Sequence, residues 1–196
     1  MRLQHWLVLF ASATIVLGQM PGRPPGSGFP QQEPSGVPGL DNGTMPPLEH
    51  QVDEREFVRE AAVSSLAGVE LGKLAAQKGS SEEVRQFGQK TADQESKVNQ
   101  ELKTAADQAS VKTPDTLDSK RRSRVDKLSK LSGAAFDKEY VKDQIRDQEQ
   151  DVQAFEDEAE HGTNQNLRDF ANKNLPELRQ TLEAARALKK GTEARD

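Results

Sequence analysis

Polar side chains interrupt the apolar faces of three predicted helices in this chain. One face advances by three or four residues at a time, through Val84, Phe87, Thr91, Gln94, Val98, Leu102, Ala105 and Ala109. Gln148 interrupts a second such face, and Asn174 and Thr181 interrupt a third. A buried amide or hydroxyl without a partner costs about 1 to 3 kcal/mol. The spacing therefore predicts a buried, hydrogen-bonded polar layer of Gln94, Gln148, Asn174 and Thr181 that fixes helix register.

Three carboxylates have positions that would allow a weaker oxygen-donor site for a hard cation, namely Glu70, Glu95 and Asp147. The competing interpretation is that they lie on ordinary solvated helix faces. We favour the solvated face for Glu70. For Glu95 the sequence leaves both interpretations open, because this residue shares a helical turn with the inward-facing Gln94.

One histidine stands at a metal-ligand spacing. Glu158 and His161 are three residues apart, which places a carboxylate and an imidazole on one helix face. Di-iron helical bundles use two such motifs together with further glutamates, whereas this chain has one, beside Gly162. A histidine at a helix end also interacts favourably with the helix dipole, and we favour that role. The weak metal candidates are therefore Glu95, Asp147, Glu158 and His161. We expect no cofactor, and a bound divalent metal is the disfavoured alternative.

No recognisable catalytic constellation accompanies these groups. The chain has no cysteine, no Ser/His/Asp arrangement and no glycine-rich phosphate-binding loop. Its formal net charge is −5, with 30% charged and 5% aromatic residues, which is typical of an acidic helical protein without a bias toward nucleic acid. We therefore expect a protein that is not an enzyme and has no nucleic-acid partner.

Five helices are needed to position these residues. Caps and apolar spacing predict them at residues 53–78, 80–109, 116–131 and 134–160, and from 163 or 164 onward. Pro176 lies inside the last of them, where a proline removes one backbone hydrogen bond. We expect a kink there or a break at Asn174.

The chain contains an internal repeat with an offset of 83 residues. Phe57-Val58, Val69, Val84 to Gly88 and Lys90 recur in register as Tyr140-Val141, Val152, Leu167 to Ala171 and Lys173. Two copies are too few for a solenoid, which needs at least about three. The repeat predicts one helical hairpin written twice, and two such hairpins suit a four-helix bundle.

The chain divides into four predicted parts, which are a signal peptide (1–18), a disordered linker (19–52), the helical domain (53–190) and a tail (191–196). The first part carries an apolar run from Trp6 to Leu17, as secretory signals do. A membrane anchor is the alternative, but the run is shorter than the roughly 20 residues that a spanning helix needs. Residues 19–50 hold eight of the ten prolines and six of the fourteen glycines, which predicts disorder.

Several motifs together carry a resemblance to a known family. They are Phe57 to Ala62, Val69 to Ala75, Val84 to Phe87, Gly133 to Asp137 followed by Tyr140-Val141, and Leu175-Pro176-x-Leu178. The chain resembles the domain-of-unknown-function 4142 family, whose members are exported bacterial proteins, regarded as ferritin-like and often labelled outer membrane proteins. The resemblance covers residues 53–188. It implies an all-α, ferritin-like four-helix bundle of two repeated helical hairpins joined by a shorter linking helix.

The resemblance also bears on the predicted polar layer. The family pattern has Asp-His where this chain has Gln94-Glu95, Asp-His again at Asp147-Gln148, and a histidine at Thr181. In the family, such a layer would suit a metal or a proton-active cluster, since imidazole is the commonest transition-metal ligand. All three histidines are replaced here, which favours a hydrogen-bonded layer over a metal site.

Charge is distributed unevenly between two predicted helices. Residues 112–130 hold seven basic and three acidic side chains, whereas residues 137–160 hold ten acidic and three basic side chains. A basic helix of this kind docks on the acidic one or binds an anionic surface, although a charged run is more often a solvated face. The sequence leaves these alternatives open.

These expectations give a leading hypothesis and an alternative. The leading hypothesis is a non-enzymatic, exported bundle with a binding or structural role, located in the periplasm, in the cell envelope or outside the cell. It would have no transmembrane segment after signal cleavage, and its envelope partner is not identified by the sequence. The alternative is a metal-binding or redox protein with a degenerate site.

Overall fold

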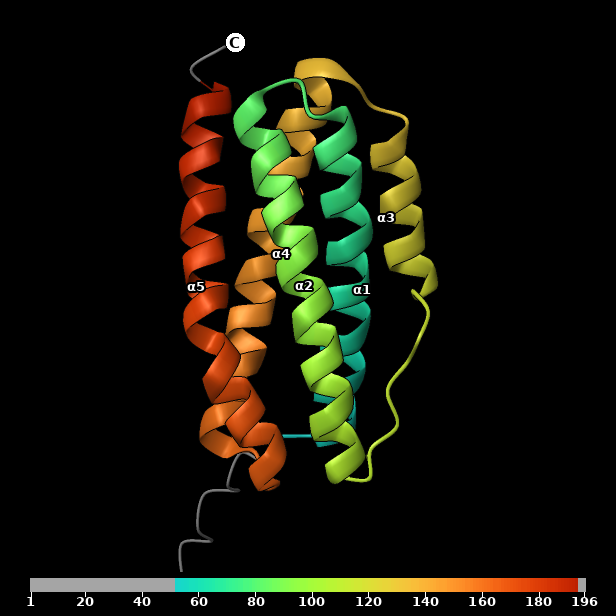
Figure 1. Cartoon of the computed structure of the whole chain (residues 1–196), viewed down its shortest axis with the longest axis vertical. Coiled ribbons are helices and arrows are strands. Elements are labelled where there is room, and N and C mark those ends of the chain that lie inside the picture. The colour runs from blue at the N-terminus through green and yellow to red at the C-terminus, as the bar shows by residue number, and fades with distance from the viewer. Residues whose placement is uncertain (1–51, 194–196) are drawn as a thin grey trace, which may run out of the picture. The chain divides into compact units, whose positions relative to one another are not determined.

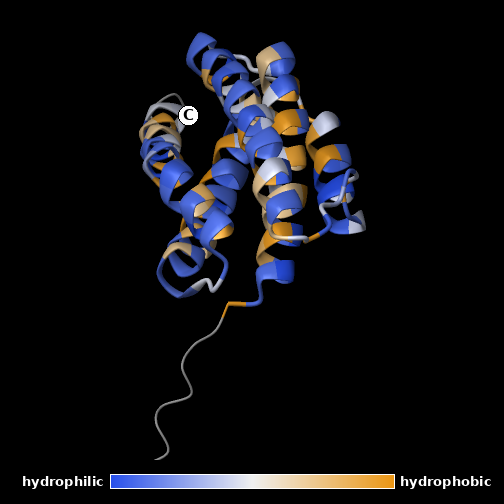
Figure 2. Cartoon of the chain, turned by 60° about the horizontal axis from the view of Figure 1, so that its bottom comes forward, coloured by the Kyte–Doolittle hydropathy of each residue, from blue (hydrophilic) through white to orange (hydrophobic). Residues whose placement is uncertain are grey.

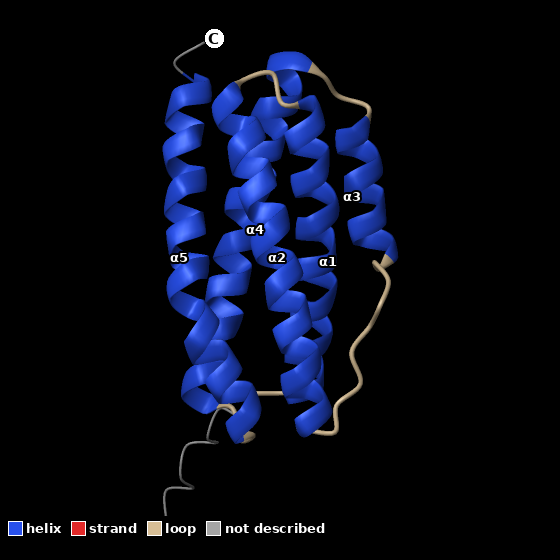
Figure 3. Cartoon of the chain, viewed as in Figure 1, coloured by secondary structure: helices blue, strands red, loops and turns tan. Residues whose placement is uncertain are grey.

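The computed structural model describes residues 52–193, which form five α-helices and, within that range, no β-strand (Figure 3). The helices are α1 (Glu54–Lys78), α2 (Glu82–Gln108), α3 (Ser119–Ser129), α4 (Gly133–His161) and α5 (Gln165–Glu193). The predicted all-α class is therefore confirmed. The predicted signal peptide and linker lie outside the described residues, apart from Val52, which packs against the bundle.

The first two helices begin at the predicted caps. The Asp53 carboxylate accepts hydrogen bonds from the backbone N–H groups of Arg55 and Glu56, at 3.1 and 3.2 Å. The Ser81 hydroxyl accepts one from the backbone N–H of Val84 at 3.2 Å. These bonds satisfy donors that have no partner inside the helix, and they fix where α1 and α2 start.

The last helix, α5, runs through Pro176 without interruption. The break that the sequence allowed at Asn174 is therefore wrong, and this residue donates its side-chain N–H to the carbonyl of Phe170 at 3.0 Å. Leu175 and Leu178 flank the proline and are 9% and 1% exposed, so packing holds the helix on both sides of it. The lower part of α5 is inclined to its upper part (Figure 1), as expected of a helix that contains proline.

The four long helices pack side by side as two hairpins. The loop of residues 79–81 joins α1 to α2, and the loop of residues 162–164 joins α4 to α5. We refer to the two ends of the bundle by these loops. The hairpins meet through α2 against α5 and α1 against α4. The connection between them runs the length of the bundle, and α3 lies within it, outside the four helices and against α1 and α4 (Figure 1).

The two hairpins hold each other's loops by equivalent contacts. Asp137 of α4 accepts hydrogen bonds from the backbone N–H and the hydroxyl of Ser80, at 2.9 and 2.6 Å. Glu54 of α1 accepts the same pair of bonds from Thr163, also at 2.9 and 2.6 Å. Both pairs of residues are related by the offset of 83, so the sequence repeat is also a structural pseudo-symmetry.

Two apolar clusters fill the bundle, one toward each end. The cluster toward the 162–164 end contains Phe57, Phe155 and Phe170, whose ring centroids lie 5.3 to 6.4 Å apart. The cluster toward the 79–81 end contains Phe87 and Tyr140, with centroids 6.2 Å apart. Hydrophilic residues cover much of the outside of the helices (Figure 2). Within residues 52–193, no helix combines the length and the apolar character that crossing a bilayer requires.

The α1–α2 hairpin is packed backbone against backbone at Gly72 and Gly88. A Cβ on Gly88 would lie 2.6 Å from the Cβ of Ala75 and 2.7 Å from the carbonyl oxygen of Gly72. The repeat places Phe155 and Ala171 at the equivalent positions of the α4–α5 hairpin. The second hairpin is therefore packed through side chains at this level.

Replacing Gly88 tests this close approach. Gly88→Ala is expected to lower the free energy of unfolding by about 1 to 3 kcal/mol, because the added methyl group has no room. Gly191→Ala in α5 is the matched control, since a Cβ there meets nothing within 4 Å; it should be neutral or stabilise by up to about 1 kcal/mol. Urea unfolding measures both, and a Gly88→Ala protein as stable as the parent would contradict the packing.

Candidate functional site

Buried polar residues separate the two apolar clusters. They come from all four long helices, and none is more than 7% exposed: Ser64, Ser65, Thr91, Gln94, Glu95, Asn99, Gln144, Asp147, Gln148 and Thr181. We call this set the polar layer. The sequence predicted Gln94, Gln148 and Thr181 at such inward positions, and the structure places all three in the layer.

Glu95 and Gln148 form the central contact of the polar layer. The Gln148 Nε2 donates to the Glu95 Oε1 at 3.1 Å, and the two residues are 3% and 2% exposed. Gly68 of α1 makes room for this contact, because a Cβ there would lie 2.6 Å from the Cγ of Glu95. The sequence singled out both residues but predicted Gln94 and Thr181, not Glu95, as partners of Gln148.

The carboxyl of Glu95 is held in its neutral form. The pKa of Glu95 is raised to about 8, mainly by burial and in part by the negative charge of Asp151, while the hydrogen bond from Gln148 opposes the rise. A protonated carboxyl gains an O–H donor. The Gln148 Oε1 is a buried acceptor without a partner among the described residues. The two side chains are therefore suited to a two-bond acid–amide pair at neutral pH.

Gln94 and Thr181 form a second, separate pair. The Thr181 hydroxyl donates to the Gln94 Oε1 at 2.7 Å. Asn174 is also buried, but it lies nearer the 162–164 end, where its amide donates to Glu101 of α2 at 3.2 Å. The four residues that the sequence grouped are thus divided among three contacts.

The short helix α3 adds a guanidinium at the edge of the layer. Arg124 donates to both carboxylate oxygens of Asp147, with Nη1 to Oδ1 at 2.6 Å, and its Nε lies 3.1 Å from an oxygen of Asp143. Burial raises the pKa of Asp143, and the charge of Arg124 opposes that rise. The basic helix therefore docks on the acidic one within the molecule. The sequence pointed to Asp147 and to this charge asymmetry but not to Arg124.

Asp151 lies one turn beyond Asp147 on α4. It is half-buried and accepts a hydrogen bond from the Ser64 hydroxyl of α1 at 2.8 Å. Burial raises the pKa of Asp151 to about 7, the charge of Asp147 adds to the rise, and the bond from Ser64 opposes it. A second carboxyl beside the layer therefore titrates near neutral pH.

Glu158 and His161 do not form a joint site. Glu158 is fully buried, and neither of its carboxylate oxygens has a hydrogen-bond partner among the described residues. Burial raises its pKa to about 7, and the charge of Glu54 adds to that rise. The His161 side chain is 45% exposed at the last position of α4, with its Nε2 3.8 Å from a carboxylate oxygen of Glu160.

The four predicted metal candidates therefore lie in unrelated surroundings. Glu95 is bonded to Gln148, Asp147 is neutralised by Arg124, and Glu158 and His161 belong to the 162–164 end. Glu70 forms a surface ion pair with Arg122 at 2.9 Å. Across residues 52–193, no three His, Cys, Asp or Glu side chains converge in a metal-binding arrangement. The residues present do not fit a di-iron centre built from glutamates and histidines.

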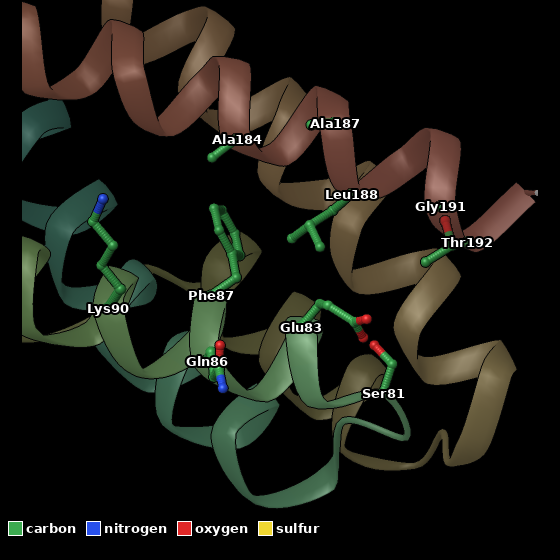
Figure 4. A pocket seen from close by; sticks show the side chains of 10 residues that line it. All are labelled: Ser81, Glu83, Gln86, Phe87, Lys90, Ala184, Ala187, Leu188, Gly191 and Thr192. Carbon is green, nitrogen blue, oxygen red and sulfur yellow. The ribbon is translucent and has the colours of Figure 1, made fainter.

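A surface cleft lies between α2 and α5 near the 79–81 end. It has a volume of about 530 Å³, and its apolar lining consists of Phe87 from α2 and Ala184, Ala187 and Leu188 from α5. Figure 4 shows Phe87 and Leu188 reaching into the same space from opposite helices, with Lys90 at the edge. The sequence analysis did not identify this cleft.

Removing the amide of Gln148 tests the acid–amide pair. Gln148→Leu is expected to destabilise the protein by about 1 to 3 kcal/mol, because Glu95 is left buried without its donor. Adding Glu95→Leu should recover part of the loss, since no polar partner is then stranded. Denaturant unfolding of both variants measures this. A Gln148→Leu protein clearly more stable than the parent would rule out a stabilising pair.

The pH dependence of stability tests the proton on Glu95. The ordinary pKa of this group is 4.5 and its pKa in the folded protein is about 8, so between these values the folded state binds more protons than the unfolded state. Stability should therefore fall as pH rises through this window. Glu95→Gln keeps an acceptor for the Gln148 Nε2 and adds a donor for its Oε1 without titrating, so it should flatten the fall. Asp151 and Glu158, raised to about 7, contribute the remainder in the same direction. Identical slopes in parent and variant would contradict the assignment.

Comparison with known proteins places this architecture in a family. The family described as Domain of unknown function (DUF4142) matches residues 42–188, which include both hairpins except the last five residues of α5. No curated protein and no solved structure gave a match. The motifs that suggested the resemblance, the repeated hairpins and the matched range agree, and this chain belongs to the domain-of-unknown-function 4142 family.

Proposed function

We propose that this protein is exported and has a non-enzymatic binding or structural role in the cell envelope. The signal-like residues 1–18 and the exported character of the resembling proteins support the location. The observation that carries the non-enzymatic role is the enclosure of three carboxyl groups in and beside the polar layer, those of Glu95, Asp143 and Asp147.

That enclosure separates these groups from any substrate. A general acid or base must come within hydrogen-bond reach of the group it serves. Glu95 is 3% exposed and bonded to Gln148, and the side chains of Asp143 and Asp147 are 7% and 8% exposed beneath Arg124. Shifted pKa values often mark catalytic sites, but here burial inside the bundle is the main cause of the raised pKa of Glu95 and of Asp143.

We further propose that the four long helices have the ferritin-like arrangement. Support comes from the connection between the hairpins, which starts after α2 at the 162–164 end and returns along the bundle to begin α4 at the 79–81 end (Figure 1). Ferritin-like bundles are distinguished by one long crossover of this kind. The reciprocal contacts of Glu54 and Asp137 fit such a pair of repeated hairpins.

The alternative is a metal-binding or redox bundle with a degenerate site. One observation favours it: Glu95 and Gln148, which replace histidines of the family pattern, touch each other in the interior. A carboxylate and an amide oxygen are ligands that hard cations accept. The neutral form of Glu95 and the occupation of Asp147 by Arg124 weigh against this alternative.

Elemental analysis separates the two functions. Protein purified without chelators is expected to contain no stoichiometric iron, manganese or zinc, and Glu95→Gln should not change its metal content. About one metal ion per chain in the parent, lost in Glu95→Gln, would establish the alternative function. Thr181→Val serves as a control, because it changes the polar layer without touching the Glu95–Gln148 contact.

Intact-mass measurement tests export. Protein isolated from its native envelope should begin near Gln19, because the apolar run of residues 1–18 has the length of a signal peptide. A mass that retains these residues would contradict cleavage. Recovery of the protein from the soluble interior of the cell would contradict the proposed location.

A further inference from the structure

The cleft beside Phe87 continues along α2 and α5 into a second cleft of about 560 Å³. Gln86 and Lys90 line both, so the two form one elongated groove, which we call the α2–α5 groove. One half is lined by the apolar Phe87, Ala184, Ala187 and Leu188, together with polar residues that include Ser81, Glu83 and Thr192. The other half is polar and includes Gln94 and Lys97. A largely apolar pocket with a few placed polar groups is the usual form of a small-molecule site.

The polar half presents a buried donor that lacks an acceptor. Gln94 is 5% exposed and lines the groove, and its Nε2 has no hydrogen-bond partner within the described part of the chain. Its Oε1 is already occupied by the Thr181 hydroxyl, which fixes the amide and leaves the Nε2 for another partner. Buried donors of this kind are rare unless something outside the protein satisfies them.

Lys90 adds a cation one turn away on the same face of α2. No ion pair or side-chain hydrogen bond joins it to another residue between 52 and 193. The acidic side chains of the polar half are already engaged, since Asp93 accepts from Gln89 at 3.0 Å and Glu177 lies 3.9 Å from Lys97. Among the described residues, Lys90 is the lining cation that no carboxylate pairs, whereas Lys97 has Glu177 beside it.

The position that the repeat makes equivalent to this groove is closed by an ion pair. At the other end of the α2–α5 interface, Lys173 donates to Glu101 at 2.8 Å, which bridges the two helices beside Phe170. The offset of 83 relates Lys173 to Lys90 and Phe170 to Phe87, but it relates Glu101 to Ala184. The bridging carboxylate is thus replaced by a methyl group, which opens the groove and leaves Lys90 without its partner.

We propose that the α2–α5 groove binds a single-chain amphiphile with an anionic oxygen head, of the fatty-carboxylate class. Its tail lies against Phe87, Ala184 and Leu188. Its carboxylate accepts from the Gln94 Nε2 and pairs with Lys90. This proposal deepens the binding role proposed above by naming a site and a ligand class for it.

Calorimetric titration of the full chain with dodecanoate, below its micelle-forming concentration, tests the proposal. Dodecanoate should bind at about one molecule per chain. Butyrate, which has the head without the tail, should show at least tenfold weaker binding, and dodecanol, which has the tail without the charge, should also be weaker. No binding of dodecanoate, or equal binding of butyrate, would overturn the proposal.

A substitution that should close the groove tests where dodecanoate binds. Ala184→Glu is expected to bridge to Lys90 as Glu101 does to Lys173, and to weaken dodecanoate binding at least tenfold. Ala184→Gln has the same size without the charge and should weaken it less. Glu101→Gln, at the equivalent closed position, should leave binding unchanged. Circular dichroism checks that each variant folds.

The outcome of this titration is independent of the tests of the proposed function. If the Ala184→Glu variant binds dodecanoate as tightly as the parent does, the ligand binds elsewhere and the proposed site in the α2–α5 groove is wrong. Export is judged by intact mass, and the choice between a metal-free and a metal-binding bundle is judged by metal content; both results would stand if dodecanoate failed to bind.

Discussion

The rest of the structure depends on two reciprocal contacts, in which a carboxylate of each hairpin accepts hydrogen bonds from the loop of the other. Each loop exposes backbone donors that its own hairpin does not satisfy, and the other hairpin supplies the acceptor, Asp137 at one end and Glu54 at the other. The two contacts are far apart along the bundle, so together they fix both the tilt and the register of one hairpin on the other. Any slip along the helices would break both at once.

The polar layer follows from this fixed register. Because both ends of the hairpins are held in place, each residue in the middle of a helix has a fixed partner on the facing helix. A carboxyl group can therefore be buried opposite an amide, as Glu95 is opposite Gln148. Burial then keeps Glu95 neutral, whereas Asp147 stays paired because α3 brings Arg124 to it. The two carboxyl groups differ in the hydrogen-bond donor that each one meets. Glu95 meets the amide of Gln148 on α4, and Asp147 meets the guanidinium of Arg124 on α3.

Much of the fold could be predicted because the sequence of one helical hairpin is repeated in the other. The offset of 83 and the apolar spacing were sufficient for the helices and for the inward position of Gln148. They did not predict its partner, because α2 and α4 are not neighbours in sequence and several polar residues of α2 face inward. Arg124 was missed because α3 has little periodicity and its position depends on docking. The aligned repeat shows that Ala184 stands at the position equivalent to Glu101. The effect on Lys90 can be seen only once α2 is known to pack on α5.

The contact of Gly72 with Gly88 gives the two hairpins unequal stiffness. Where backbones touch directly, no side chain can change rotamer to accommodate a shift, so α1 and α2 move as one body. The α4–α5 hairpin meets through Phe155 and Ala171 at the same level, and side chains can repack there. The same added volume would therefore act differently in the two hairpins: between α1 and α2 it must displace backbone, whereas between α4 and α5 it meets side chains.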